Sequence, residues 1–166
     1  MIKHIVAIDS ANGFAKMVDG TLGIPWDIPA DKQQYRNHIL GKRVLVGHAT
    51  YRLGRAVEYS YVLSDDAGLV IPAGEGMRVS TAAEAIKDNG DRDLWVIGGL
   101  SVYAATLDAE AAECFADELY ITCVAGDFAC DRHYPAIPAV FRRVFRSEQC
   151  EDNGYSFHIE QYVRTS

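Results

Sequence analysis

The sequence of 166 residues lacks a long apolar run and has no excess of basic residues. No segment approaches the ~18 apolar residues that a membrane span needs, so we expect no membrane association. Lys and Arg number 16 against 23 Asp and Glu, which gives a formal net charge of −7. General nucleic-acid binding is excluded because it needs a clustered basic face. A small anionic substrate is not excluded, since local charges decide its binding.

Cysteine and histidine are also few and widely spaced. The cysteines at 114, 123, 130 and 150 form no Cys-x-x-Cys pair, and the five histidines form no His-x-x-x-His. We therefore expect no structural or catalytic metal. The N-terminal residues 1–9 are charged too early for a signal peptide, which predicts a cytoplasmic protein with reduced thiols.

What the sequence does contain is an alternation of apolar runs and helical segments. Strands are expected at 2–8, 43–47, 59–64, 77–79, 94–97, 118–124 and 141–145, and helices at 29–40, 81–89 and 100–107. The turn Asp152-Asn153-Gly154 precedes strict alternation at 155–160, which is typical of an antiparallel hairpin. The pattern predicts one α/β domain over residues 1–166, with a mostly parallel central sheet and helices on both faces.

Residues 10–25 are rich in glycine and show little periodicity. We interpret them as a long surface loop, and unstructured loops of that length tend to be functional lids. The segment that follows runs Gly23-Ile24-Pro25-Trp26-Asp27-Ile28-Pro29-Ala30-Asp31. Its prolines place Trp26 in a rigid turn and begin a helix, so Asp31 falls in the first helical turn with Tyr35 on the same face. Asp31 is a candidate proton donor in an apolar pocket; the alternative is an Asp that the helix macrodipole favours at this position.

Small residues follow three of the expected strands, and parallel sheets bind ligands at the carboxyl ends of their strands. These residues are Gly47 with Ala49 and Thr50, Ser64 with Asp65, and Gly98-Gly99 with Leu100 and Ser101. A Gly-Gly pair between a strand and a helix lets the backbone approach a phosphate, and Thr50, which we expect to begin a helical turn, can serve a second one. Together they match a dinucleotide, although Gly-Gly is also compatible with a simple tight turn.

The order of these motifs resembles the dihydrofolate reductase family over nearly the whole chain. The resemblance rests on Ile5-Val6-Ala7, residues 24–31, Val46-Gly47-His48-Ala49-Thr50-Tyr51, Val62-Leu63-Ser64, Val96-Ile97-Gly98-Gly99-Leu100-Ser101-Val102-Tyr103, Leu119-Tyr120-Ile121-Thr122 and Asp131-Arg132-His133-Tyr134-Pro135. It implies hydride transfer from NADPH to dihydrofolate in a monomeric enzyme of tetrahydrofolate biosynthesis and one-carbon metabolism.

The resemblance also implies roles for individual residues. Asp31 would promote protonation of the substrate, Trp26 would order a water beside it, and Thr122 would support it by a hydrogen bond. The substrate would contact Ile5, Val6, Ala7, Ile28, Tyr35, Arg36, Ile97 and Tyr103. The cofactor would contact Ala7, Gly47, His48, Ala49, Thr50, Leu63, Ser64, Asp65 and residues 97–103. Residues 12–25 would close over the nicotinamide, held by Asp131.

Two departures from the family pattern alter these expectations. Glu58 stands where an arginine usually binds the folate α-carboxylate, so we expect Arg36, or else Arg52 or Arg55, to take that part. His48 and Ser101 stand where basic residues usually bind the cofactor 2′-phosphate, and Asp65 adds an acid near the ribose. An acid there favours a free 2′-hydroxyl, which predicts a weakened preference for NADPH and appreciable use of NADH.

Two other functions stay open at this point. One is a reductase of the same fold that acts on a ribosylamino-pyrimidine in riboflavin synthesis, which the short segment around Glu58 would allow. The other is a non-catalytic nucleotide-binding module, against which Asp31 and Thr122 argue.

Overall fold

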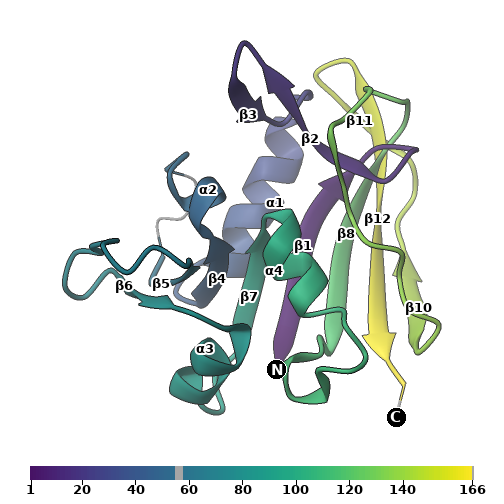
Figure 1. Ribbon diagram of the computed structural model, residues 1–166. Helices are drawn as coiled ribbons and strands as arrows, with labels where there is room; N and C mark the ends of the chain where they lie inside the picture. Colours follow the sequence, from purple (N-terminus) through teal and green to yellow (C-terminus); the bar gives the residue numbers. More distant parts are fainter. Residues whose placement is uncertain (55–57, 166) are drawn as a thin grey trace.

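Parallel strands form the centre of the fold. The computed structural model describes residues 1–54 and 58–165. The large sheet consists of β1 (Ile2–Ile8), β4 (Arg43–Gly47), β5 (Ser60–Leu63), β6 (Gly76–Val79), β7 (Leu94–Gly98), β8 (Glu118–Val124), β10 (Phe141–Arg146), β11 (Cys150–Asp152) and β12 (Tyr155–Arg164). Among the described residues its order is β10-β12-β8-β1-β7-β4-β5-β6, with β11 paired to β12 (Figure 1). Every pairing from β8 to β6 is parallel, and β12 runs antiparallel to its neighbours.

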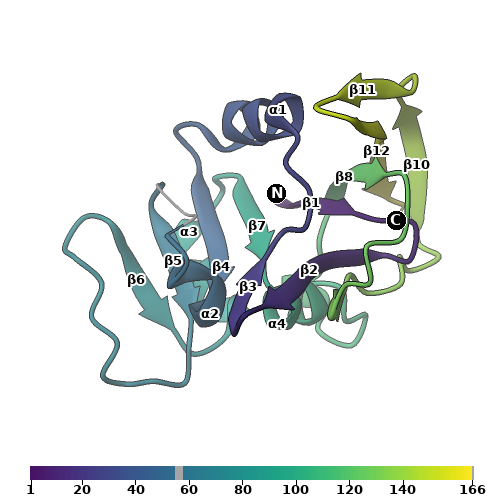
Figure 2. The ribbon, with the colours of Figure 1, turned by 90° about the horizontal axis from the view of Figure 1, so that it is seen from above.

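Helices cover both faces of this sheet. They are α1 (Pro29–Ile39), α2 (His48–Tyr51), α3 (Ala82–Asn89), α4 (Leu100–Ala105) and the 3-10 helix η1 (Ala112–Cys114). Ile39 of α1 packs against Ile5, Val44 and Trp95 on one face, whereas α3 and α4 join the apolar cluster of the other face. Figure 2 shows α1 and α4 on opposite sides of the sheet. This is the mostly parallel α/β arrangement with an antiparallel C-terminal hairpin that the sequence predicts.

Local signals locate most of the helix ends. The Thr81 side chain accepts a hydrogen bond from the Glu84 N–H, as a capping residue does, and α3 ends before Gly90. Two details differ from expectation. α4 ends at Ala105 rather than at residue 107, and α2 begins at His48, so Thr50 lies inside that helix and does not begin it. The chain turns into α2 directly at Gly47, which closes strand β4.

The prediction of an irregular loop at residues 10–25 is wrong. Most of that segment forms a hairpin of β2 (Gly13–Val18) and β3 (Thr21–Gly23), and β2 also pairs with β9 (Arg132–His133). Asp19 and Gly20, with φ of 50° and 77°, form the tight turn between β2 and β3. An Asp-Gly pair with positive φ at both positions is favoured in such turns, so the signal was present in the sequence.

No helix among the described residues combines the length and apolar character that crossing a membrane requires. All four cysteines are free thiols, and Cys114 and Cys130 are buried.

Candidate active site

The proline-rich segment before α1 directs Asp31 toward the sheet. Ile28 is buried and caps α1 through its backbone, and Pro29 occupies the first helical turn, where a missing N–H costs nothing. The Asp152 carboxylate accepts a hydrogen bond from the Ala30 N–H at 2.8 Å. The Asn153 side chain donates to the Asp27 carbonyl at 2.8 Å. The turn between β11 and β12 therefore fixes the start of α1.

Asp31 pairs with a threonine on the central sheet. The Thr122 hydroxyl donates to Asp31 Oδ1 at 2.5 Å, and Thr122 pairs with Ala7 across β8 and β1. Burial raises the pKa of the Asp31 carboxyl above its ordinary value, and the hydrogen bond from Thr122 offsets part of that rise. A carboxyl group that is partly buried and sparsely hydrogen-bonded holds its proton more tightly than a solvated one. Asp31 is thus suited to supply a proton.

Apolar and aromatic side chains surround this pair. Trp26 is buried in a cluster with Ile28, and the half-buried Ala7 packs against it. The Trp26 ring meets Phe128 edge-on, with ring centroids 5.2 Å apart. On the other side, Tyr35 and Ile97 pack against the cluster that contains Ile5. The arrangement can hold a flat heterocycle beside one acid.

The ends of β4 and β7 approach each other closely beside this pocket. A Cβ at Gly99 would lie 3.0 Å from Thr50 Oγ1, and a Cβ at Gly47 would lie 3.3 Å from Ser101 Oγ. The Gly98–Gly99 peptide is cis, and Gly99 is the N-terminal cap of α4. Backbone N–H groups and two hydroxyls therefore meet where no larger side chain fits, as the approach of a phosphate requires.

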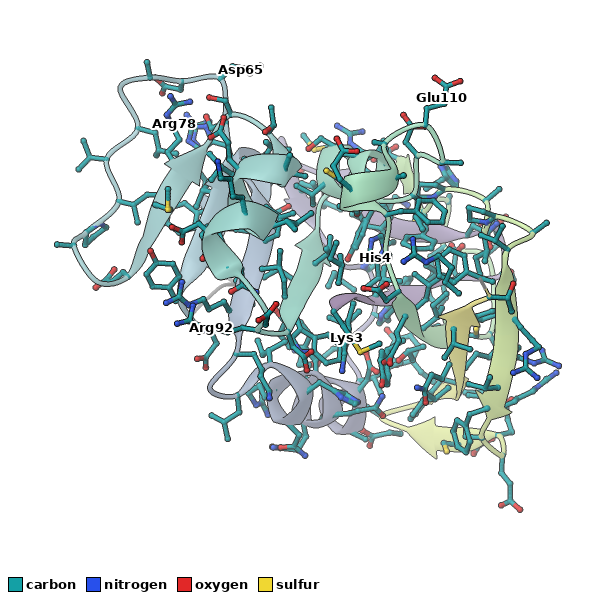
Figure 3. The ribbon with its side chains drawn as sticks, turned by 90° about the horizontal axis from the view of Figure 1, so that it is seen from below. Lys3, His4, Asp65, Arg78, Arg92 and Glu110 are labelled. Carbon is teal, nitrogen blue, oxygen red and sulfur yellow. The ribbon has the colours of Figure 1, made fainter. Side chains whose placement is uncertain are left out.

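A second polar group lies at the end of β5. The His48 ring nitrogen Nδ1 and Ser64 Oγ are 2.8 Å apart, and the Arg78 guanidinium donates to the Ser64 carbonyl at 2.7 Å. Arg78 and the exposed Asp65 lie at the same end of the molecule (Figure 3). A hollow of about 590 Å³ opens next to them, lined by His48, Tyr51, Arg52, Gly54, Asp66, Gly68, Leu69 and Val70.

Comparison with known proteins decides the family. A sequence model described as dihydrofolate reductase matches residues 1–164. The chain belongs to the dihydrofolate reductase family. The dihydrofolate reductase of Bacillus subtilis (strain 168) is 25% identical to it over 99% of this chain and 95% of its own length. Dihydrofolate reductase type 3 of Salmonella typhimurium is 29% identical over 82% of this chain and 83% of its own length.

Membership makes the chain an oxidoreductase with dihydrofolate as its substrate, and it disfavours the reductase of riboflavin synthesis. The structure brings together most residues that the resemblance to dihydrofolate reductase implied. Val6 is an exception, because its side chain packs in the cluster on the opposite face of the sheet from Ile5. Tyr103 and Val102 are also buried in that cluster, and the Tyr103 hydroxyl donates to the Ile5 carbonyl at 3.0 Å. The side chains of Val6, Val102 and Tyr103 therefore lie in the cluster opposite to the one that contains Ile5.

The expected substitutes for the carboxylate-binding arginine lie at the margin of the site. Arg36 is exposed on α1, where it donates to the Gln33 side chain at 3.1 Å. Arg52 lines the hollow beside α2, and Arg55 lies outside the described residues. Glu58 is half-buried before β5.

Three residues near the site escaped the sequence analysis. Phe128 forms one wall beside Trp26, Asp152 binds the start of α1, and Arg78 lies against Ser64. Phe128 and Asp152 come from distant parts of the chain, and no local pattern marks them. Arg78 carried a signal, since it occupies the strand expected next to the one that ends at Ser64.

His4 is buried against the apolar cluster that contains Val6 and Tyr103. Its ring nitrogens lie 2.8 Å from the Tyr134 hydroxyl and 2.6 Å from the Thr106 hydroxyl. Its ring also contacts Tyr103, with centroids 5.3 Å apart, and Figure 3 shows it inside the molecule. Burial lowers the pKa of His4 to about 3, so the ring is neutral at physiological pH. The contacts of His4 are those of a packing residue.

Proposed function

We propose that this enzyme reduces 7,8-dihydrofolate to tetrahydrofolate with Asp31 promoting protonation of the substrate. The observation that carries the proposal is the Asp31–Thr122 hydrogen bond at the edge of an apolar pocket. The reduced nicotinamide cofactor supplies the hydride when it is bound. Asp31 binds the amino-pyrimidine edge of the substrate, Thr122 orients Asp31, and Trp26 holds a water beside it.

The remaining predicted residues divide between the two ligands. We propose that Ile5, Ala7, Ile28, Tyr35 and Ile97 contact the reacting rings, and that Gly47, Ala49, Thr50 and Gly98–Tyr103 hold the cofactor phosphates and nicotinamide. The close approach of Gly99 to Thr50 supports this division, because a side chain at residue 99 would occupy the space that a phosphate needs. His48, Leu63, Ser64 and Asp65 then lie toward the adenosine end.

The β2–β3 hairpin is proposed to close over the cofactor and exclude water. The contacts of β2 with the segment after β8 support this. The Asp131 carboxylate accepts a hydrogen bond from the Met17 N–H at 2.5 Å, and its N–H donates to the Ala15 carbonyl at 2.9 Å.

Loss of reduced-nicotinamide absorbance tests the reaction. Purified protein is expected to oxidise NADPH only when dihydrofolate is present, and a ribosylamino-pyrimidine is expected to give no turnover. Binding of both ligands without turnover would instead indicate a non-catalytic nucleotide-binding module.

We also propose that the enzyme uses NADH to an appreciable extent. Residue 48 is a histidine and residue 101 is a serine, so neither position has a lysine or arginine for a 2′-phosphate. Asp65 adds an acid near the ribose, which also supports weak binding of a 2′-phosphate. Steady-state rates with both cofactors test this, and a preference for NADPH above about a thousandfold, roughly 4 kcal/mol, would contradict it. Arg78, whose guanidinium donates to the Ser64 carbonyl, is proposed to give what remains of the preference for NADPH, so Arg78→Ala is expected to lower kcat/KM for NADPH and leave that for NADH unchanged.

Arg36 is proposed to bind the carboxylate tail of the substrate, since it projects from α1 near Tyr35 and its partner Gln33 is uncharged. Arg36→Ala is then expected to raise KM for dihydrofolate by up to about tenfold with kcat unchanged. Finally, we propose that residues 1–166 act as one monomeric domain in the cytoplasm. The four free thiols support a reducing compartment, and light scattering tests the oligomeric state.

A further inference from the structure

Three side chains that can bind a metal ion lie together on the sheet face opposite to Asp31. Cys123 comes from β8, and His158 and Glu160 come from β12. Their donor atoms all lie within 4.8 Å of one another. Cys123 follows Thr122 directly, and successive residues of a strand point to opposite faces, so this group lies away from the substrate pocket.

The pairing of β8 with β12 creates this group. Cys123 lies directly opposite His158 in the antiparallel register, and Glu160 is on the same face two residues along β12. Spacing along the chain therefore gave no sign of Cys123, although a His-x-Glu pair on a strand places two ligands on one face. The mechanism proposed for dihydrofolate uses none of these three residues.

Two of the donor distances lie in the range of a metal site, each to a different oxygen of Glu160. Cys123 Sγ and Glu160 Oε2 are 3.6 Å apart, and His158 Nε2 and Glu160 Oε1 are 3.3 Å apart. Ligands placed tetrahedrally around an ion at about 2.0–2.3 Å are separated by roughly 3.3–3.8 Å. All three donor atoms lie within 4.8 Å of one another, so one ion can reach them together once the side chains adjust.

We propose that Cys123, His158 and Glu160 bind one divalent transition-metal ion of the zinc class, with water as a fourth ligand. Thiolate and imidazole ligands select Zn²⁺ or Co²⁺ over Mg²⁺ and Ca²⁺, which prefer oxygen ligands. Three protein ligands leave one coordination position for water, as in open zinc sites. The Cys123 thiol gives its proton to the buffer as its sulfur binds the ion, and no group changes oxidation state.

Two side chains already bind the Glu160 carboxylate, and an ion must compete with them or share it. The Arg143 guanidinium pairs with Glu160 Oε1 at 2.9 Å, and the Tyr162 hydroxyl donates to Oε2 at 2.8 Å. Arg143 lies on the edge strand β10 and its side chain is 46% exposed, so it can turn into solvent when an ion takes its place. Tyr162 can keep its hydrogen bond and orient the carboxylate. Arg143 is thus a competitor for the site.

Titration of the purified protein with Co²⁺ tests the proposal. We expect a saturable thiolate-to-cobalt charge-transfer band at one ion per chain, which added Zn²⁺ removes. Cys123→Ser keeps the size of the side chain and is expected to abolish the band and weaken Co²⁺ binding by at least about a hundredfold, because loss of an outer partner already costs up to that much. Cys150→Ser is the matched control, since Cys150 is also half-buried but lies outside the group, and it is expected to bind as the wild type does.

Two further measurements keep the test independent of folding defects. Zn²⁺ is expected to protect Cys123, and not Cys150, from alkylation mapped by mass spectrometry in the wild-type protein. Arg143→Ala is expected to tighten Co²⁺ binding by about twofold to fivefold, the factor that corresponds to loss of a competing exposed ion pair. A charge-transfer band that survives Cys123→Ser, the lack of any saturable band, or weaker binding in Arg143→Ala would overturn the proposal.

Discussion

Two aspartates near the end of β1 differ in how the fold treats their charge. Asp9 directly follows β1 and is almost completely buried. Its carboxylate accepts backbone hydrogen bonds from Gly13 at 2.7 Å, Ala11 at 2.9 Å and Phe128 at 3.0 Å. Asp31 lies in the first turn of α1 and its side chain is more exposed, and its carboxylate accepts one hydrogen bond among the described residues, from Thr122.

The two carboxyl groups differ in the number of hydrogen-bond donors that face them. Burial by itself raises the pKa of Asp9, but the hydrogen bonds from Phe128, Gly13 and Ala11 outweigh it and hold the pKa below its ordinary value. At Asp31 burial prevails and the pKa is raised. Asp9 is a fixed anion that shapes the turn into β2, whereas Asp31 is left able to take up and release a proton.

Replacing Asp31 by asparagine is expected to have the largest effect. Asp31→Asn keeps the shape of the side chain and removes the acid, so kcat/KM for dihydrofolate near neutral pH should fall at least about a hundredfold, equal to about 2.7 kcal/mol of transition-state stabilisation. Loss of cofactor absorbance under steady-state conditions measures this. Asp27→Asn is the matched control, because Asp27 is an exposed carboxylate of the same segment that pairs with Lys32.

The stability of Asp31→Asn is expected to move the other way. A carboxyl group with a raised folded-state pKa binds its proton more tightly in the folded protein, so the wild type loses stability as pH rises from the ordinary value through the raised one. An amide has no such loss, and Asp31→Asn should be at least as stable as the wild type at neutral pH. A variant that is both inactive and clearly less stable would assign Asp31 a structural role.

Asp9→Asn is expected to show the reverse, with a loss of stability. The amide replaces one acceptor oxygen by an NH₂ group that faces N–H donors, which should cost about 2–3 kcal/mol and lower Tm by roughly 4–12 °C. The gap to the wild type should narrow in acid, because a carboxyl with a lowered folded-state pKa contributes its stability above the ordinary value and loses it as pH falls through the lowered one. Thermal unfolding at neutral and acid pH measures both. Asp127→Asn is the control, because Asp127 is an exposed aspartate next to Phe128, and it is expected to change Tm little.

The same two aspartates show what the sequence can predict. The apolar run of β1 and the proline-led start of α1 are local signals, and both elements form where expected. Asp9 takes two of its backbone donors, Ala11 and Gly13, from its own turn, but the fold brings the third, the Phe128 N–H, from far along the chain. The pairing of Asp31 with Thr122 spans 91 residues and was expected from the family resemblance alone.

The hairpin after Asp9 is the clearest failure of local reasoning. Gly13 reads as a loop residue, yet a Cβ there would lie 2.4 Å from the Cβ of Cys130, so it marks a close approach of two chain segments. Strand β2 is stabilised by pairing with β9 as well as with β3, and pairing with a distant segment leaves no periodic pattern in the residues themselves. The Asp19-Gly20 turn between β2 and β3 is a local signal, whereas the pairing of β2 with β9 is not.

Thr122→Val is expected to have a smaller effect and to sharpen the contrast between the aspartates. Because the Thr122 hydroxyl lowers the pKa of Asp31, its removal should raise that pKa further and move the alkaline limb of the pH profile of kcat/KM to higher pH. Asp31 also loses an orienting contact, which should reduce kcat/KM about tenfold on the plateau, equal to about 1.4 kcal/mol. Thr122→Ser keeps a hydroxyl and should restore both the limb and most of the rate. If Thr122→Val lowers the rate while the limb stays in place, the hydroxyl orients Asp31 without governing its proton, and the single-donor explanation of its raised pKa is wrong.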